Sequence, residues 1–517
     1  MNGEELMALC KRRGVFWPSA ELYGGAQGLY DYGPVGIAIK KRLEEAWVQW
    51  FVGLSPDYHL IDPAEILPEA VVRASGHLAN FADLEVLCGQ CGTASRADHL
   101  LEEAGVASGE GLRPEEVRIL LEERKVRCPR CGADKLSVPT PFNLMFGLDF
   151  GATGRERAYL RPETAQGAYL AFPRMWEVAR KQLPFGIGVI GKAYRNEIAP
   201  RQGLFRMRAF TQAELQIFFD PEEFLPEWEP MADLAIPVLR ADERAAGSQE
   251  ARPRTVRELV EKGGLPPFYA FHMAVLFRFA RDVLGYPADR IRFLEKNEKE
   301  RAFYNRIHMD LEVKLDSLGG FKEMGAVHYR GDYDLTRHGE GSGTDLSVTT
   351  SRGKHLVPHV LEVTFGVDRN LWALADLHLA TEPSPDPGEP PRTVWRLPSY
   401  LAPTLVGVIP LIRKEHTSFA RELSGKLRDE GLSTALELTG SVGKRYARLD
   451  EIGVPRALTI DAETITQGTV TIRDRDTRAQ VRRPVIEVAA ALRPGSIPPR
   501  FSAGAGEPTP GTRSISI

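Results

Sequence analysis

Cysteine, net charge and long hydrophobic runs are all scarce in this sequence. Five cysteines among 517 residues do not make a disulfide-stabilised scaffold, so a reducing, cytoplasmic location is expected. No run of about 18 uncharged apolar residues occurs, so neither a membrane-spanning helix nor a membrane partner is expected. The acidic pair Glu4-Glu5 stands where a signal peptide needs basic residues. The 66 Lys and Arg against 70 Asp and Glu, a net charge of −4, exclude a histone-like basic protein.

The composition is that of a globular protein, with 43% hydrophobic and 26% charged residues. At roughly 150 residues per domain, the 517 residues suggest about three domains. Four shifts in composition divide the chain. Residues 86–136 carry four cysteines, and residues 222–300 are first charged and then apolar. The proline-rich residues 381–392 indicate a stiff linker, and residues 494–517 have little to bury and predict disorder.

Residues 401–493 alternate short apolar segments with amphipathic ones. Strands are predicted at 406–411, 435–438 and 457–460, and a helix at 418–431. This pattern is typical of a small α/β domain. The segment has 15 Lys and Arg against 12 Asp and Glu, a local charge of +3, which favours a polyanion as its partner.

Two C-x-x-C pairs, Cys88 with Cys91 and Cys128 with Cys131, form the clearest metal signal. Each turn can direct two thiolates to one point, and two turns complete a tetrahedral structural zinc site. A redox pair is the alternative, but it would explain only one of the two motifs and lacks a thioredoxin-like βαβ context.

Residues 191–215 read as two alternating strands around a loop, as in a long hairpin. Arg195, Arg206 and Arg208 converge on this loop, and Phe210 follows it. Guanidinium groups can neutralise a polyphosphate, and an aromatic ring can stack on a base. A solvated arginine loop on a surface hairpin is the alternative interpretation.

This stretch resembles motif 2 of the class II aminoacyl-tRNA synthetases, and Gly366-Val367-Asp368-Arg369 resembles motif 3. Further segments make the whole resemble the homodimeric type of glycyl-tRNA synthetase, with a cysteine-containing insertion like that of archaeal members. These segments are Tyr23-Gly24-Gly25, Tyr30-Asp31-Tyr32-Gly33-Pro34, Ala74-Ser75-Gly76-His77, residues 159–167, Asp332-Tyr333-Asp334-Leu335 and Gly443-Lys444-Arg445-Tyr446.

The resemblance implies an α+β fold: a class II antiparallel sheet flanked by helices, a zinc-type insertion, a helical insertion and a C-terminal α/β anticodon-binding domain. The implied boundaries follow the composition shifts. They are 1–85 for the N-terminal part with motif 1, 86–136 for the zinc-type insertion with its four cysteines, 137–221 for the core with motif 2, 222–300 for a mostly helical insertion, 301–380 for the core with motif 3, 381–400 for the linker, 401–493 for the anticodon-binding domain and 494–517 for the tail.

The resemblance also implies an ATP site, in which catalytic roles fall on Arg195, Glu197 and Arg369. Arg195 would hold the α-phosphate during the reaction, while Arg206 and Arg208 would reach the outer phosphates. Phe210 and Arg369 would cover the two faces of the adenine. The full implied set is Arg195, Asn196, Glu197, Phe205, Arg206, Arg208, Phe210, Glu323, Met324, Gly366, Val367, Asp368 and Arg369.

Glycine offers only an ammonium, a carboxylate and a lack of bulk for recognition. The family pocket maps its ammonium-binding carboxylates onto Glu163, Glu214 and Glu362, and its carboxylate-binding arginines onto Arg96 and Arg330. The full implied set is Arg96, Glu163, Phe210, Thr211, Gln212, Ala213, Glu214, Arg330, Glu362, Thr364 and Gly366.

The implied cofactors are Mg²⁺ with ATP, held by Glu323 and Glu362, and a structural Zn²⁺ held by the four cysteines. The implied partners are glycine, ATP, tRNA(Gly) and a second copy of the chain. Motif 1, a helix at 37–51 followed by an extended segment at 58–61, would build the dimer interface, although an ordinary core helix explains the same pattern.

Within 401–493, five cations near turns are expected to face the RNA: Lys444, Arg445, Arg448, Arg473 and Arg475. Acidic residues are interleaved with them, so a salt-bridged surface is the alternative.

The implied activity is that of a glycine–tRNA ligase, which forms glycyl-adenylate and transfers glycine to the 3′ end of tRNA(Gly). Three alternatives remain at this point. One is another class II synthetase, whose pocket should not need Glu163, Glu214 and Glu362 together. The second is a non-catalytic, synthetase-like nucleic-acid-binding subunit, which could lose Arg195 and Arg369. The third is a zinc-dependent nucleic-acid-binding protein, which leaves these residues unexplained.

Overall fold

The computed structural model describes residues 1–106, 112–152, 154, 156–200, 202–224, 226, 228–383, 391–493 and 495–500. Within these ranges no helix is long and apolar enough to cross a membrane. The centre of the predicted linker and most of the predicted tail lie outside the described residues.

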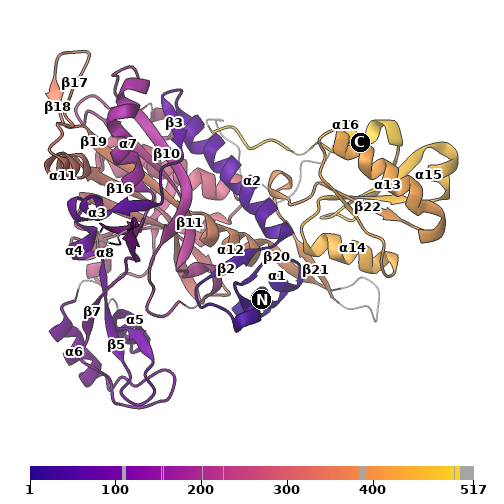
Figure 1. Cartoon of the computed structure of the whole chain (residues 1–517). Helices are drawn as coiled ribbons and strands as arrows, with labels where there is room; N and C mark the ends of the chain where they lie inside the picture. The colour runs from indigo at the N-terminus through magenta and orange to yellow at the C-terminus, as the bar shows by residue number, and fades with distance from the viewer. Residues whose placement is uncertain are drawn as a thin grey trace.

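A nine-stranded sheet forms the centre of the larger body (Figure 1). In spatial order its strands are β13 (Arg252–Thr255), β12 (Ala235–Leu239), β14 (Ile291–Glu295), β15 (Ile307–Leu315), β16 (Gly320–Gly331), β19 (His359–Gly366), β11 (Ala209–Phe219), β10 (Phe185–Tyr194) and β3 (Tyr58–Ile61). Neighbouring strands are antiparallel except at β12–β14 and β10–β3. The predicted antiparallel α+β core is therefore confirmed.

Residues 222–300 extend this sheet as well as supplying helices. The segment contains α8 (Ala241–Ala245), α9 (Val256–Glu261) and α10 (Pro267–Arg278), but it also provides β12, β13 and β14. It is therefore not a separate helical insertion. Its short alternating strands complete their hydrogen bonds by pairing with the edge of the central sheet at β15.

One face of the sheet is covered by apolar helices, which form the main core. α2 (Pro34–Phe51) and α12 (Val367–His378) pack there with α10, against Leu215 of β11 and Val363 of β19. α10 is apolar nearly all round, and residues 268–277 are all buried.

The opposite face has an apolar floor at one end and polar side chains at the other. α7 (Ala165–Val178) and α11 (Tyr333–Ser342) lie over the floor, where Phe185 of β10 stacks on Phe218 of β11 with ring centroids 5.1 Å apart.

The cysteine-containing insertion is a small module at one end of the molecule (Figure 1). Its sheet contains β6 (Ala94–Arg96), β5 (Ala82–Leu87) and β7 (Thr140–Asn143). Helices α5 (Ala97–Glu103) and α6 (Pro114–Glu123) pack together between the two C-x-x-C turns and share a small apolar core. The module spans the sheet from β5 to β7, so it is wider than the predicted 86–136.

The C-terminal domain has the predicted α/β architecture. Its five-stranded sheet has the order β23 (Thr434–Leu436), β22 (Val406–Pro410), β24 (Arg456–Ile460), β25 (Thr469–Asp474), β26 (Gln480–Pro484). Its helices are α13 (Arg413–Asp429), α14 (Val442–Glu451), α15 (Ala462–Gln467) and α16 (Val488–Ala491).

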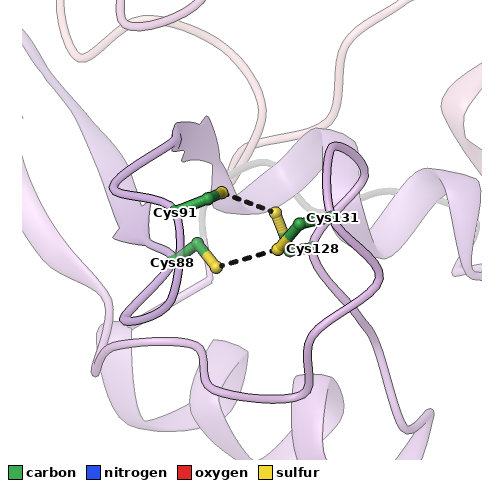
Figure 2. A group of neighbouring side chains, drawn as sticks. All are labelled: Cys88, Cys91, Cys128 and Cys131. Atoms are coloured by element: carbon green, nitrogen blue, oxygen red, sulfur yellow. Dashed lines mark hydrogen bonds between the residues drawn. The ribbon is translucent and has the colours of Figure 1, made fainter.

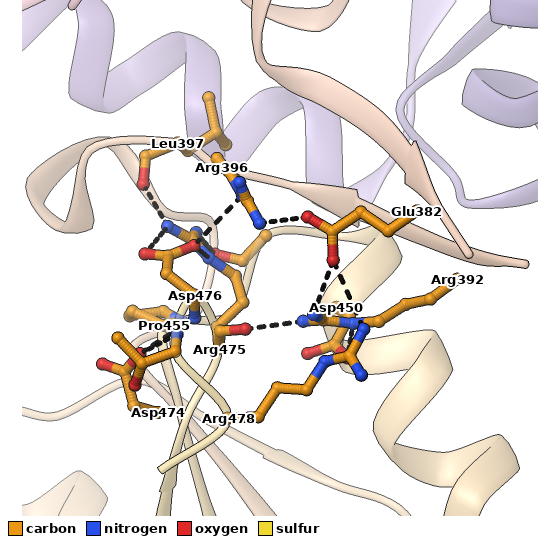
Figure 3. Close-up of polar contacts among 12 residues, drawn as sticks. Glu382, Arg392, Arg396, Leu397, Asp450, Pro455, Asp474, Arg475, Asp476 and Arg478 are labelled. Atoms are coloured by element: carbon orange, nitrogen blue, oxygen red, sulfur yellow. Dashed lines mark hydrogen bonds and ion pairs between the residues drawn. The ribbon is translucent and has the colours of Figure 1, made fainter. Parts of the chain in front are cut away.

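The predicted linker is in part a β-hairpin that joins the two bodies. β20 (Leu379–Glu382) and β21 (Arg392–Trp395) pair as a two-stranded sheet. Arg392 donates to Asp450 of α14 at 2.8 Å and to the carbonyl of Arg475 at 2.6 Å (Figure 3). The polar contacts of its arginine, rather than proline stiffness alone, hold this segment against the C-terminal domain.

Four of the five cations expected to face RNA have protein partners instead. Arg475 is 4% exposed and donates to the carbonyl of Leu397 at 2.9 Å (Figure 3). It also donates to the carbonyl of Gly453 at 2.9 Å. Arg473 is 8% exposed and makes two contacts with Asp450, at 3.0 and 3.2 Å.

The same holds for two arginines of α14. Arg445 is buried and donates to the carbonyl of Gly440 at 3.0 Å, and Arg448 donates to Glu437 at 2.8 Å. Of the five, only Lys444 is exposed without such a partner. The salt-bridged alternative is therefore correct for this surface, because neighbouring carboxylates and carbonyls already take the arginine donors.

Residues 495–500 return from the C-terminal domain to the larger body. Ile497 packs on the main core, and the guanidinium of Arg500 donates to carbonyls at the C-terminal end of α2, among them that of Trp50 at 3.1 Å. The predicted disorder therefore does not extend to these six residues, because the free carbonyls of a helix end attract a cation.

Candidate active site

Strand alternation gathers polar side chains on the sheet face opposite the main core. Glu214 of β11 lies opposite Thr364 of β19, and Gln216 lies opposite Glu362. Gln216 donates to Glu362 at 2.7 Å, and Thr364 donates to the same carboxylate at 3.0 Å. His328 of β16 also lies opposite Glu362, so three neighbouring strands contribute to one polar surface.

The same alternation corrects the predicted run at 210–214. Ala213 is fully buried in the main core, and Thr211 lies on the same face of the strand as Ala213. The backbone N–H of Thr211 donates to Asp368 and so holds motif 3 in place. Five consecutive strand residues cannot all face one ligand, because side chains alternate between faces. Only Phe210, Gln212 and Glu214 of this run face the site.

Arg330 is the centre of the polar surface. Its guanidinium is 0% exposed and donates to Asp334 at 2.7 and 2.8 Å and to Glu362 at 3.0 Å, with Glu163 at 3.6 Å. Tyr304 lies over it, with 3.7 Å between the guanidinium carbon and the ring centroid. The predicted contact between Arg330 and a substrate carboxylate is not supported, since its donors are taken by protein carboxylates. Arg330 instead orients the carboxylates around it.

Glu163 lies in the turn before α7. Gln166 donates to it at 2.8 Å, and His77 Nε2 lies 3.5 Å from the same carboxylate oxygen. Burial alone would raise the pKa of Glu163, but the charges of His77 and Arg330 outweigh burial and lower it. Glu163 is therefore an ionised carboxylate in this site.

The pKa values of Glu214 and Glu362 are raised, unlike that of Glu163, because these two carboxyl groups have less compensating positive charge around them. Burial first, and then the neighbouring carboxylates Glu362 and Glu163, raise the pKa of Glu214 well above its ordinary value. Thr164 donates to Glu214 at 2.6 Å. Burial also raises the pKa of Glu362, although Arg330 opposes the shift. The cluster thus holds more carboxyl groups than fixed cations, so an added cation would favour the ionised forms of Glu214 and Glu362.

Arg195 begins the motif 2 loop beside this cluster. Its guanidinium lies between two aromatic rings, 5.2 Å from the Phe81 centroid and 5.3 Å from the Phe210 centroid. Its Nε donates to the carbonyl of Pro162 at 3.2 Å, next to Glu163 in the chain. Arg195 is therefore held at the boundary between the carboxylate cluster and the arginine-rich loop.

The other loop arginines lie farther from the carboxylates. Arg208 donates to the backbone carbonyls of Gln27 and Glu197, both at 3.1 Å. Arg206 lies 3.5 Å from Glu197 and donates to His99 at 3.2 Å. Burial, together with the positive charge of Arg96, lowers the pKa of Arg206. This guanidinium lacks full charge compensation, as expected at a site for a polyanion.

Arg96 does not join the carboxylate cluster, contrary to the prediction. It forms ion pairs at 2.5 Å with both Asp83 and Asp98, and its charge acts on Arg206. Its position at the end of β6 places it beside the motif 2 loop. The insertion therefore contacts the motif 2 loop rather than the carboxylate cluster.

Motif 3 contributes Arg369 at the start of α12. Its guanidinium lies 3.1 Å from the Glu323 carboxylate and 5.5 Å from the Phe205 ring centroid. The side chains of Val367 and Met324 are fully buried in the main core, so only their backbones can reach a nucleotide. A β-bulge in β16 turns the Met324 side chain to the face of the sheet that packs on the main core.

Asp368, also predicted to bind ATP, is 1% exposed and accepts hydrogen bonds from Tyr32 and from the Thr211 backbone. It fixes the start of α12 to β2 (Tyr30–Tyr32) and β11. Asn196 anchors the loop through its backbone N–H, which donates to Leu144 at 2.7 Å. Gly366 lies opposite Gln212 at the end of the polar surface.

Glu323 and Glu362 cannot share one Mg²⁺ ion. Glu362 pairs with His328, which is five residues from Glu323 on β16, or roughly 16 Å at about 3.3 Å per residue. Carboxylate ligands of Mg²⁺ lie at about 2.1 Å from the ion. Glu323 belongs to the Arg369 end of the site and Glu362 to the Arg330 end.

The four predicted cysteine ligands converge (Figure 2). Their sulfur atoms all lie within 4.8 Å of one another, with Cys88–Cys131 and Cys91–Cys128 each at 3.6 Å. These separations are too long for disulfides. A tetrahedral Zn²⁺ with Zn–S bonds of about 2.3 Å needs S···S distances of about 3.8 Å, so the arrangement fits zinc.

Several residues of the site carried no predicted role. Asp334, Thr164, Gln216, His77 and His99 each contact a predicted residue. The i, i+4 spacing of Arg330 and Asp334 was a local signal for their pairing. The other contacts join residues far apart in the sequence, so the chain gives no local signal for them, although His77 and Thr164 lie within segments that carry the family resemblance.

Comparisons with known proteins agree with this architecture. The family model described as "tRNA synthetase class II core domain (G, H, P, S and T)" matches residues 149–378, and "Anticodon binding domain" matches 405–494. A solved prolyl-tRNA synthetase from Cryptosporidium parvum has a TM-score of 0.54 at 13% identity, covering 94% of this chain and 73% of that chain. The core, the motifs and the appended domain define a class II aminoacyl-tRNA synthetase.

Curated relatives narrow the class further. A glycine–tRNA ligase of Thermococcus gammatolerans is 37% identical over 569 residues, which cover 95% of this chain and 98% of the relative. Glycine–tRNA ligases of Aeropyrum pernix and Pyrococcus furiosus are 37% and 36% identical, each over 95% of this chain and over 96% and 98% of their own lengths. The chain belongs to the glycine–tRNA ligase family, as its motifs predicted.

Proposed function

We propose that this chain activates glycine with ATP, releasing diphosphate, and transfers the glycyl group to the 3′ end of tRNA(Gly). The observation that carries this proposal is the buried cluster of Glu163, Glu214 and Glu362 around Arg330. It provides excess negative charge for an ammonium group, and it adjoins the arginines of motifs 2 and 3. The other class II and non-catalytic interpretations are less favoured, because this cluster and both motif arginines occur together.

The site selects glycine by excluding bulk. Thr364 sits between Glu214 and Glu362, and its methyl group narrows the space beside the ammonium site. Phe210 and Tyr304 add rigid rings at the edges of the cluster. A steric clash rejects a larger amino acid more strongly than a missing contact would.

The arginines act by position and charge. Arg195, next to the carboxylate cluster, is placed to stabilise the α-phosphate as the glycine carboxylate attacks it. Arg206 and Arg208 would bind the outer phosphates, and Arg369 with Phe210 would enclose the adenine. Such catalysis needs no nucleophilic side chain, because orientation and electrostatic stabilisation supply the rate.

Two metal ions belong to this proposal. Mg²⁺ would enter with ATP, and Glu323 is the carboxylate best placed at the nucleotide end to meet it. Zn²⁺ would be held by the four cysteines and would fix the insertion that carries Arg96 and His99. Zinc in such a closed site supplies folding energy rather than chemistry.

We also propose a cytoplasmic homodimer. Most apolar residues of α2, including Trp47 and Trp50, are buried within the chain itself, so they act as an ordinary core helix. Leu60 on β3 remains 48% exposed and Ile37 39% exposed. Because β3 ends the sheet, the second copy would lie along this edge.

The test is ATP–diphosphate exchange with each of the twenty amino acids. Exchange should depend on glycine and Mg²⁺, with alanine and serine much poorer substrates. Arg195→Ala should lower kcat roughly 10²–10³-fold, as loss of one transition-state donor does. The matched control is Arg118→Ala on the surface of α6, which should leave the rate unchanged. Exchange with serine or threonine and none with glycine would refute the proposal.

A further inference from the structure

The cysteine-containing insertion touches the motif 2 loop through a histidine that has no role in the proposed function. His99 stands in the first turn of α5, and its neighbours Ala97 and Leu100 are buried in the small core of the insertion. Its backbone N–H donates to the carboxylate of Asp98 at 2.9 Å. The insertion therefore holds the start of α5, from which the His99 ring reaches motif 2.

The contact with motif 2 is a hydrogen bond donated by an arginine. Arg206 Nη1 donates to His99 Nδ1 at 3.2 Å. A guanidinium group has only donors, so Nδ1 is the unprotonated nitrogen of the ring, and the ring proton is on Nε2. Burial first, and then the charge of Arg206, lower the pKa of His99 to about 4, although Asp98 opposes the shift. His99 is therefore a neutral acceptor at neutral pH.

The guanidinium of Arg206 is held from two sides. Glu197 Oε2 lies 3.5 Å from its Nε, and His99 accepts from its Nη1. Within the part of the chain that the structure describes, no group accepts a hydrogen bond from Nη2 of Arg206. The two contacts fix the plane of the guanidinium, and the two N–H groups of Nη2 remain for a ligand.

A neutral partner orients this arginine without cancelling its charge. The nearby carboxylates Asp83 and Asp98 are both paired with Arg96, each at 2.5 Å. A carboxylate in place of the His99 ring would pair with Arg206 and weaken its attraction for a polyanion. An imidazole acceptor leaves that positive charge available.

We propose that His99 is a positioning residue of the ATP site, whose Nδ1 fixes the Arg206 guanidinium so that its free Nη2 edge meets the outer phosphates of ATP. This inference rests on the proposed function, which assigns Arg206 to those phosphates. A long side chain loses rotamer entropy when it binds a ligand, and the loss is smaller if the side chain is already held. His99 therefore strengthens ATP binding through Arg206 without touching ATP itself.

The test compares three variants of His99 in glycine-dependent ATP–diphosphate exchange. His99→Ala removes the acceptor. His99→Asn keeps an acceptor oxygen on Cγ, the atom that carries Nδ1 in histidine, whereas His99→Gln moves the amide one carbon farther away. His99→Ala and His99→Gln should raise the KM for ATP about tenfold, because a hydrogen bond to a charged group is lost. His99→Asn should recover most of this loss, and the KM for glycine should stay unchanged in all three.

Further readouts separate positioning from a structural role. AMP has no outer phosphates, so its inhibition constant should be the same in His99→Ala and in the wild type. Zinc content and the thermal midpoint of unfolding should also be unchanged. The matched control is His355→Ala, since His355 is exposed on β18 (His355–Leu356), far from the insertion (Figure 1). This control should leave every one of these values unchanged.

The outcomes distinguish this inference from the proposed function. Absence of glycine-dependent exchange in the wild type would refute the function. In an active wild type, an unchanged KM for ATP in His99→Ala would overturn the role of His99. Equal losses in His99→Asn and His99→Gln, a parallel rise in the KM for glycine, or weaker inhibition by AMP would overturn it as well. If His99→Ala loses zinc, the comparison of His99→Asn with His99→Gln decides the question.

Discussion

Arg330→Gln should destabilise the catalytic body more than any other single charge change in the site. The side chain is 0% exposed and contacts Asp334, Glu362 and Glu163. Removing it leaves these buried carboxylates without their shared cation. Breaking a buried ion pair by removal of one partner costs about 3–5 kcal/mol. The free energy of unfolding should fall by about that amount at neutral pH.

The loss of stability in Arg330→Gln should become larger as pH rises. Without Arg330, whose charge opposes the effect of burial on Glu362, the folded-state pKa of Glu362 should rise further above its unfolded value near about 4. A carboxyl group with a raised folded pKa favours the unfolded state as pH rises above its unfolded pKa. The variant should therefore be closest to the wild type near pH 4 and lose stability, relative to it, as pH increases.

Urea denaturation followed by tryptophan fluorescence is the assay, since Trp47, Trp50 and Trp372 are buried in the main core. Asp334→Asn and the double variant Arg330→Gln/Asp334→Asn complete a cycle. Asp334 is fully buried and makes two contacts with Arg330, so the double variant should lose less than the sum of the single variants, by at least about 1.5 kcal/mol. Additive losses that do not change with pH would refute the reasoning.

Further outcomes test other parts of the site. Glycine binding should release a proton, because burial and the neighbouring carboxylates raise the pKa of Glu214, and an ammonium ion favours the ionised form of Glu214. The apparent glycine affinity should therefore rise with pH. Calorimetry in buffers of different ionisation enthalpy measures the number of protons released. Cys128→Ser should lower the zinc content and raise the KM for ATP more than that for glycine, since the insertion places His99 against Arg206; a selective effect on glycine would contradict this. Truncation after Trp395 should leave glycine-dependent exchange largely intact and sharply reduce tRNA charging, provided that the shortened chain folds; charging with unchanged kcat/KM would exclude an RNA-binding role for the C-terminal domain.

The sequence by itself determined the features that depend on residues near one another in the chain. The two C-x-x-C turns predicted the cysteine cluster, and the helical hairpin between them is present. The hairpin of motif 2, the apolar helix α10 and the α/β pattern of the C-terminal domain were likewise visible. Turn geometry and hydrophobic periodicity are local, so the residues alone predict them.

Tertiary structure decided how these parts combine. Strand register separated Glu323 from Glu362 and turned Ala213 into the core. Folding also surrounded Arg330 with carboxylates, paired Arg96 with Asp83 and Asp98, and made Arg475 a bridge between the bodies. A charged residue has the same local signal whether it will meet a substrate or a protein partner. Its role depends on which distant groups reach it, and only the assembled sheet and domains bring those groups within bonding distance.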